Sequence, residues 1–126
     1  MSNDYSKYSF FYQNISGQQV VGTGTGDTTL VTGKTNYTIF IQKYSVTITT
    51  SSAAITWSLE DSASTPVSIS GSLPASVAPA EFEQDYGPEG VALTADKNFV
   101  LNVSAAGAAG HVTWTGYLKL TGVAAA

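Results

Sequence analysis

Apolar and polar residues alternate with a period of two over much of this chain. The segment HVTWTGYLKL shows the pattern best, because Val112, Trp114 and Leu118 fall on one side of an extended chain. AITWSLE and NFVLNV repeat it. This alternation is typical of β-strands with one buried face. It predicts an inward-facing set that comprises Ile55, Trp57, Leu59, Phe99, Leu101, Val112, Trp114 and Leu118.

Four other segments are candidate strands. NYTIFIQKYSVTITT is apolar on both sides, which indicates either one bent strand or two strands joined near Gln42 and Lys43. PVSISGSL alternates, with Val67, Ile69 and Leu73 on one side. KYSFFYQNI is rich in aromatic residues, and TTLVTG is short.

Turn-forming residues separate these runs and set the fold class. Gly, Pro, Asp and Ser clusters recur between strand candidates at intervals of roughly 8 to 14 residues, which is the spacing of a sandwich or barrel. No segment has the period of an amphipathic helix. We therefore expect an all-β fold: a single antiparallel β-sandwich, jelly-roll-like, with about seven to nine strands. The 126 residues suit one domain, residues 1–126.

Composition excludes several classes of partner. Charged residues make up 11% of the chain, against about 25% in ordinary domains. There is no arginine and no cysteine, so we expect no nucleic-acid partner and no thiolate metal site. No apolar run reaches the roughly 20 residues of a membrane helix, and the first residues lack a signal-peptide pattern. We expect a protein that is soluble as made, with no membrane partner.

The stretch EFEQDYGPEG holds the densest acidic cluster. Glu81 and Glu83, two positions apart on an extended chain, would be about 6 to 7 Å apart, near the carboxylate separation of an inverting glycosidase. An irregular calcium site from Asp85 and Glu89 is a second alternative. Pro88 and the two glycines are turn residues. We interpret the stretch as an ordered loop that leads into the strand GVALT.

Two further motifs have ordinary structural interpretations. VVGTGTGDTT contains three glycines, but no helix pattern follows it, so we expect a loop between strands rather than a phosphate site. His111 is the only histidine, and it begins a strand on the solvent side. We therefore predict no catalytic residues, no cofactor and no metal site.

The first twelve residues are unusually aromatic. A strand there would expose one set of rings unless a partner covers them, which indicates a protein interface or a sugar platform. We predict partner contacts through this segment and through the acidic loop, namely Tyr5, Tyr8, Phe10, Phe11, Glu83, Asp85, Tyr86 and Glu89.

Residues 55 to 120 carry a family resemblance. ITWSLEDSASTPVSISG, followed by YGPEGVALTADKNFVLNVSAAGAAGHVTWTGYLKL, resembles small virion proteins of tailed bacteriophages. The resemblance implies a capsid decoration (cement) protein, or a small head- or tail-fibre domain. It implies a homo-oligomer, dimer or trimer, made in the host cytoplasm, that binds the major capsid protein on the virion surface. It carries over no catalytic residue.

The main alternative is a carbohydrate- or receptor-binding module of a fibre or tail. Such a module needs a cleft of aromatic side chains together with Asn or Asp. An enzyme is the third alternative.

Overall fold

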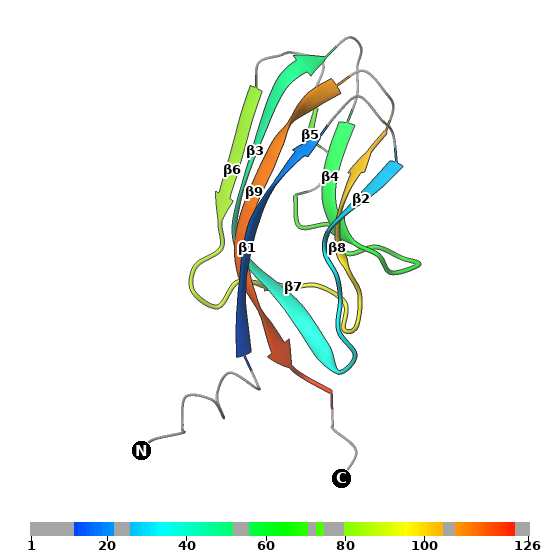
Figure 1. Cartoon of the computed structure of the whole chain (residues 1–126), viewed down its shortest axis with the longest axis vertical. Helices are drawn as coiled ribbons and strands as arrows, with labels where there is room; N and C mark the ends of the chain where they lie inside the picture. The colour runs from blue at the N-terminus through cyan, green and yellow to red at the C-terminus, as the bar shows by residue number, and fades with distance from the viewer. Residues whose placement is uncertain are drawn as a thin grey trace.

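The computed structural model describes residues 12–21, 26–51, 56–70, 73–74, 80–104 and 108–122. Within these residues, nine strands form two antiparallel sheets that pack against each other (Figure 1). The expected all-β sandwich is confirmed. Ile55 and the aromatic residues Tyr5, Tyr8, Phe10 and Phe11 lie outside the described residues.

Sheet A runs in the order β1-β9-β3-β6, and β7 pairs with β3 as well. Its strands are β1 (Tyr12–Val21), β9 (Ala108–Leu120), β3 (Tyr37–Ser51), β6 (Ala80–Asp85) and β7 (Val91–Ala92). Sheet B runs in the order β2-β8-β4-β5. Its strands are β2 (Gly26–Val31), β8 (Phe99–Val103), β4 (Thr56–Asp61) and β5 (Leu73–Pro74).

The strand pairing is that of a jelly roll. With the short β7 set aside, the first strand pairs with the last, β2 with β8, β3 with β6, and β4 with β5. The chain therefore resembles one long antiparallel hairpin that is rolled up. The pairs β3–β9 and β4–β8 close the roll into two sheets. This arrangement is the double-sheet solution that capsid and lectin domains also use.

The core lies between the two sheets and has the predicted members. All of the predicted inward residues that the structure describes are buried, and Trp57, Leu59, Phe99, Leu101 and Val112 are fully inaccessible to solvent. Side chains of β3 complete the core from sheet A, as the alternation of its two halves requires.

The ambiguous segment around Gln42 forms one strand with a bulge. In the pairing of β3 with β9, the register shifts between Ile41 and Lys43. Ile39 and Ile41 are buried before the shift, and Tyr44 is buried after it. Because a bulge adds one residue, it moves the inward positions from odd to even numbers. This shift explains why the sequence is apolar on both sides.

The prediction of a regular strand at PVSISGSL is wrong for its first half. Residues 66–70 contain only an isolated bridge between Glu60 and Ser68, and Val67 is 41% exposed. The cause is the Asp61 carboxylate, which accepts backbone N–H bonds from Ala63 and Val67. The chain therefore turns tightly after β4 instead of extending into a long strand.

Candidate functional site

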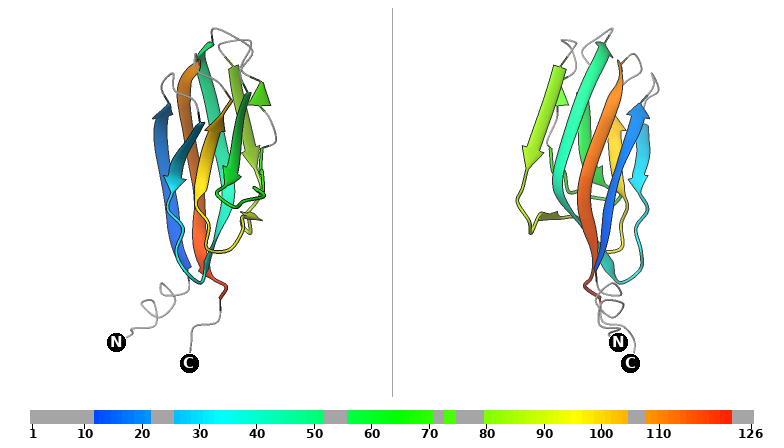
Figure 2. Two further views of the ribbon diagram at one scale, coloured as in Figure 1. Left: turned by 90° about the vertical axis from the view of Figure 1, so that its right-hand side faces the viewer. Right: turned by 60° about the vertical axis from the view of Figure 1, so that its left-hand side comes forward.

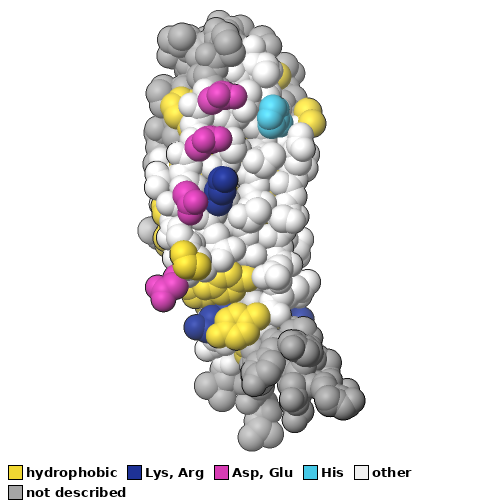
Figure 3. All heavy atoms as spheres, turned by 90° about the vertical axis from the view of Figure 1, so that its left-hand side faces the viewer, with side chains coloured by type: hydrophobic (Ala, Val, Ile, Leu, Met, Phe, Trp, Pro, Cys, Tyr) yellow, Lys and Arg dark blue, Asp and Glu magenta, His cyan; other side chains and the backbone are white. Residues whose placement is uncertain are grey.

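The outward side of sheet A, called the outer face below, belongs to the sheet with more of the described strands. Figure 3 shows acidic side chains along one side of it, a basic side chain next to them, and apolar side chains gathered at its lower end. On β9, alternate residues from His111 to Lys119 point outward while their neighbours are buried, as the sequence predicted. Polar, mainly hydroxyl-bearing side chains fill the middle of the face.

An aromatic hollow lies at one end of the outer face. It has a volume of about 460 Å³ and is lined by Tyr12, Phe40, Glu89, Gly90, Tyr117 and Lys119. The rings of Phe40 and Tyr117 are stacked, with centroids 5.0 Å apart and planes 4° apart. Tyr12 lies 6.1 Å from Tyr117 and is 49% exposed. The Lys119 ammonium is 5.8 Å from the Phe40 ring centroid, within the range of a cation–π contact.

Hydrogen bonds fix the loop that borders this hollow. The Tyr117 hydroxyl donates to the Glu89 carbonyl at 2.6 Å, and the Gln42 side-chain amide donates to the Pro88 carbonyl at 2.6 Å. Gly90 has a φ of 74°, and a Cβ there would lie 2.8 Å from the Ile41 carbonyl oxygen. Only glycine suits this position. Contacts within the chain therefore hold the border of the hollow in place.

The electrostatics of the aromatic hollow favour the neutral form of the Tyr117 hydroxyl. Burial, the nearby Tyr12 and the charge of Glu89 raise the pKa of the Tyr117 hydroxyl above its ordinary value. A neutral phenol donates a hydrogen bond, so Tyr117 remains a donor to the Glu89 carbonyl at physiological pH. The hollow thus offers ring surface, one ammonium group and one carboxylate.

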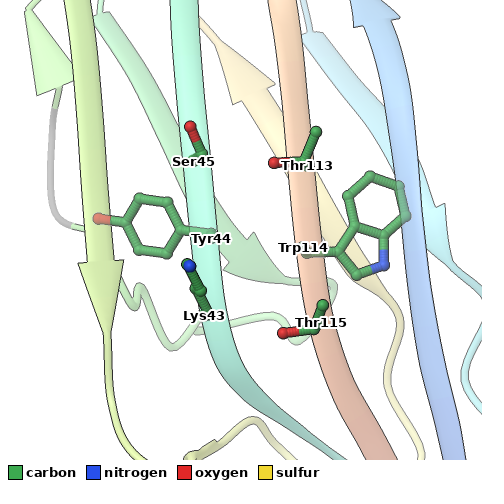
Figure 4. A pocket seen from close by; sticks show the side chains of 6 residues that line it. All are labelled: Lys43, Tyr44, Ser45, Thr113, Trp114 and Thr115. Atoms are coloured by element: carbon green, nitrogen blue, oxygen red, sulfur yellow. The ribbon is translucent and has the colours of Figure 1, made fainter.

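A second depression lies in the middle of the outer face, between β3 and β9. It has a volume of about 220 Å³ and is lined by Lys43, Tyr44, Ser45, Thr113, Trp114 and Thr115. In Figure 4 the Tyr44 ring extends toward β6 and the Trp114 indole toward β1. Both rings are almost fully buried, so the amine of Lys43 and the three hydroxyls supply the chemistry of this depression. Such groups form hydrogen bonds with polar partners.

The acidic stretch is half strand and half loop. Residues 80–85 form β6, which corrects the expectation that the whole stretch is a loop, and residues 86–90 connect β6 to β7. Glu81, Glu83 and Asp85 are exposed and pair with β3 positions whose side chains face outward. Among the described residues, no three acidic or histidine side chains form a group that fits a metal ion.

Tyr86 of the same stretch points into the fold. Its hydroxyl donates to the Ile69 carbonyl, and its ring lies 6.2 Å from the ring of Tyr44. Burial and the nearby Tyr44 raise the pKa of Tyr86 to about 12. Tyr86 therefore anchors the loop to the core, whereas Glu89 lines the aromatic hollow.

Asp61 is a described carboxylate whose pKa is shifted, and its hydrogen bonds from backbone N–H groups hold loops in place. It is 1% exposed. Burial raises the pKa of Asp61, but hydrogen bonds from Thr94, Ala63 and Val67 outweigh burial and leave that pKa below its ordinary value. A carboxylate with its lone pairs occupied by backbone donors ties two loops together and has little capacity for proton transfer.

The structure brings only some of the predicted contact residues together. Glu89 lines the aromatic hollow, whereas Glu83 and Asp85 lie along β6. His111 lies on the outer face opposite Thr47, far along β9 from the aromatic hollow. Sequence reasoning did not single out Phe40, Tyr117 or Lys119 as a group. Their grouping depends on the β3–β9 register, which places Phe40 opposite Tyr117 and which alternation along one strand does not reveal.

No protein-family model matches the chain, and neither the curated proteins nor the solved structures gave a match. In the part of the chain that is described, no helix is long and apolar enough to cross a bilayer.

Proposed function

We propose that the chain is a non-catalytic structural protein of a phage virion, which decorates and stabilises the capsid by docking through its outer face. The observation that carries this proposal is the aromatic hollow. Tyr12 is half exposed beside two stacked rings, and tyrosines in such settings are the side chains that dominate binding energy at protein interfaces. The jelly-roll sandwich agrees with the family resemblance, as an analogy of fold.

The first eleven residues extend this surface in sequence. They run directly into Tyr12, so the predicted attachment residues Tyr5, Tyr8, Phe10 and Phe11 adjoin a strand end that lines the hollow. Each buried aromatic side chain contributes about 1.5 to 3 kcal/mol. A few of them are enough to anchor each copy to the major capsid protein.

A co-sedimentation assay with purified capsids that lack this protein tests the proposal. Tyr12→Ala, and separately removal of residues 1–11, should each weaken capsid binding at least tenfold, or about 1.4 kcal/mol. Val67→Ala removes another exposed apolar side chain, outside the outer face, and serves as the matched control. Unchanged binding of both variants would place the attachment surface elsewhere and overturn the proposal.

Salt dependence separates the two predicted contact surfaces. Docking through rings and hydroxyls should depend little on ionic strength, because few charges take part. If Glu83, Asp85 and Glu89 instead meet lysines of the shell, affinity should fall steeply as salt is added. One titration therefore identifies which surface is in contact.

The alternative function, glycan binding, is favoured by one specific observation. The aromatic hollow combines ring surface with polar groups on Lys119 and Glu89, and sugars are bound by a similar combination of apolar and polar contacts. Calorimetry with oligosaccharides of the host surface tests this function. Loss of sugar binding in Tyr12→Ala, with capsid binding retained, would assign the hollow to a glycan instead of the shell.

A further inference from the structure

Apart from the two-residue β7, the described strands of sheets A and B include four edge strands, and three of these carry features that discourage pairing with another chain. β6 bears Glu81, Glu83 and Asp85. β5 has only two residues, one of them Pro74. β2 contains Asp27, and its register with β8 is irregular between Thr29 and Val31. Charges, prolines, irregularities and short length are the usual protections of an open sheet edge.

The fourth edge strand, β1, has none of these protections. Its ten residues, YQNISGQQVV, contain no charge and no proline. All ten pair with β9 without a register shift. In the right-hand view of Figure 2, β1 forms one lateral border of sheet A and β6 the other. No described strand pairs with its outer edge, so the backbone groups of alternate residues there point away from β9.

We infer that β1 is a self-association strand, which pairs antiparallel with β1 of a second copy to form a two-fold symmetric dimer. An uncharged strand does not repel its own copy. For the two outer faces to be continuous, directly opposite residues must have side chains on the same side of the sheet. The two-fold axis must therefore pass midway between the two copies of one residue. The axis at Ser16 gives the most complementary set of neighbours.

In this register the exposed apolar ends of the strand meet. Tyr12, 49% exposed, lies opposite Val20 of the second copy, which is 71% exposed. Asn14 lies opposite Gln18 on the same face, so amide faces amide. Nine residues of each strand, 12–20, pair in this register and provide about eight to ten backbone hydrogen bonds. The same strand of both copies therefore forms the interface, as in any isologous dimer.

The dimer would join two copies of sheet A into one sheet of eight long strands. A two-fold axis perpendicular to the sheet keeps both outer faces on the same side. Two aromatic hollows would then face one partner, and simultaneous docking of both raises the effective affinity. The dimer itself forms in buffer, so its test is independent of the proposed capsid function.

Single-cysteine cross-linking tests both the interface and its register, because the natural chain has no cysteine. Ser16→Cys places two sulfurs across the axis, where directly opposite Cβ atoms are about 4.5 to 5.5 Å apart, and should form a disulfide-linked dimer on mild oxidation. Gln18→Cys is the matched control: its two copies would be about 13 Å apart along the strands, too far to bridge. Cross-linking at residue 18 and not at residue 16, or at neither, would overturn the inference.

Sedimentation of the unmodified chain gives an independent measurement. The natural protein should be a dimer, and Ser16→Lys should raise the dimer dissociation constant at least tenfold, because two ammonium groups would meet on the axis. Thr29→Lys adds the same charge to an exposed position of β2 and should leave the dimer intact. A monomeric natural protein, or equal effects of the two lysines, would overturn the inference.

Discussion

The two lateral strands of sheet A occupy equivalent positions but offer opposite chemistry. β6 presents three exposed acids, whereas β1 presents ten residues without a charge. Both are edge strands with one described neighbour along most of their length. Topology alone therefore does not decide whether an edge associates. The side chains decide, since like charges directly opposite each other destabilise a strand pair.

The two edges are also attached to the core in different ways. β6 continues into a loop that Tyr86 anchors through its hydrogen bond to Ile69. β1 is held by its pairing with β9 and by the close approach of Gly17 to Trp114. The inward side of β1 also contains polar Gln19, which is only partly buried. β1 thus contributes less to the core than β3 and β9 do.

Gly17→Val should have the largest effect on this comparison. A Cβ at position 17 would lie 2.6 Å from Cζ2 of Trp114, whose ring is buried, so β1 must shift away from β9. We expect the free energy of unfolding to fall by about 1 to 3 kcal/mol in urea titrations. Thr29→Val, at an exposed position of the edge strand β2 and outside the inferred dimer interface, should change it by less than about 0.5 kcal/mol. Equal midpoints for the two variants would contradict this account of β1.

Tyr86→Phe tests the attachment of the β6 edge. Loss of the hydroxyl leaves the Ile69 carbonyl without this donor and should cost about 0.5 to 1.5 kcal/mol of unfolding free energy. The pH dependence carries a second signature. The folded pKa of about 12 exceeds the ordinary value of 10.0, so the native chain loses stability as pH rises above 10. In Tyr86→Phe, this part of the loss between pH 10 and 12 should disappear.

The sequence predicted the sandwich and its core because those depend on local alternation. Each of Trp57, Phe99 and Val112 stands in a clear period-two pattern, and each is buried. The sequence indicated an irregularity near Gln42 and turn residues after the strand of Trp57. It did not show the register shift or the N–H groups that the Asp61 carboxylate binds, because these are tertiary features. The aromatic hollow was missed for the same reason: it combines strands far apart in sequence.

Removing acidic residues from the β6 edge should increase association between copies by a moderate amount. Glu81→Thr with Glu83→Thr removes two of its three charges and leaves Asp85, whose carboxylate accepts the Gly87 N–H bond. With both lateral edges free to pair, copies should join into open-ended assemblies, which light scattering would detect as mass beyond the dimer. Glu60→Thr, on the central strand β4, is the matched loss of an acid and should leave the mass unchanged. No growth in the double variant would mean that the acids do not protect β6.

The smallest expected effect concerns the ends of β1. In the inferred dimer, Val20 of each copy lies opposite Tyr12 of the other, so Val20→Thr weakens two cross-strand contacts. Contacts of this kind are worth about 0.2 to 1 kcal/mol each, and loss of about half of both corresponds to a rise in the dimer dissociation constant of about 1.5- to 5-fold. Val67→Thr changes an exposed valine outside β1 and should have no effect. The double variant Tyr12→Ser with Val20→Thr sharpens the test. If the two residues touch across the axis, their effects on dimer affinity will not add, whereas independent effects would show that the strand ends do not meet.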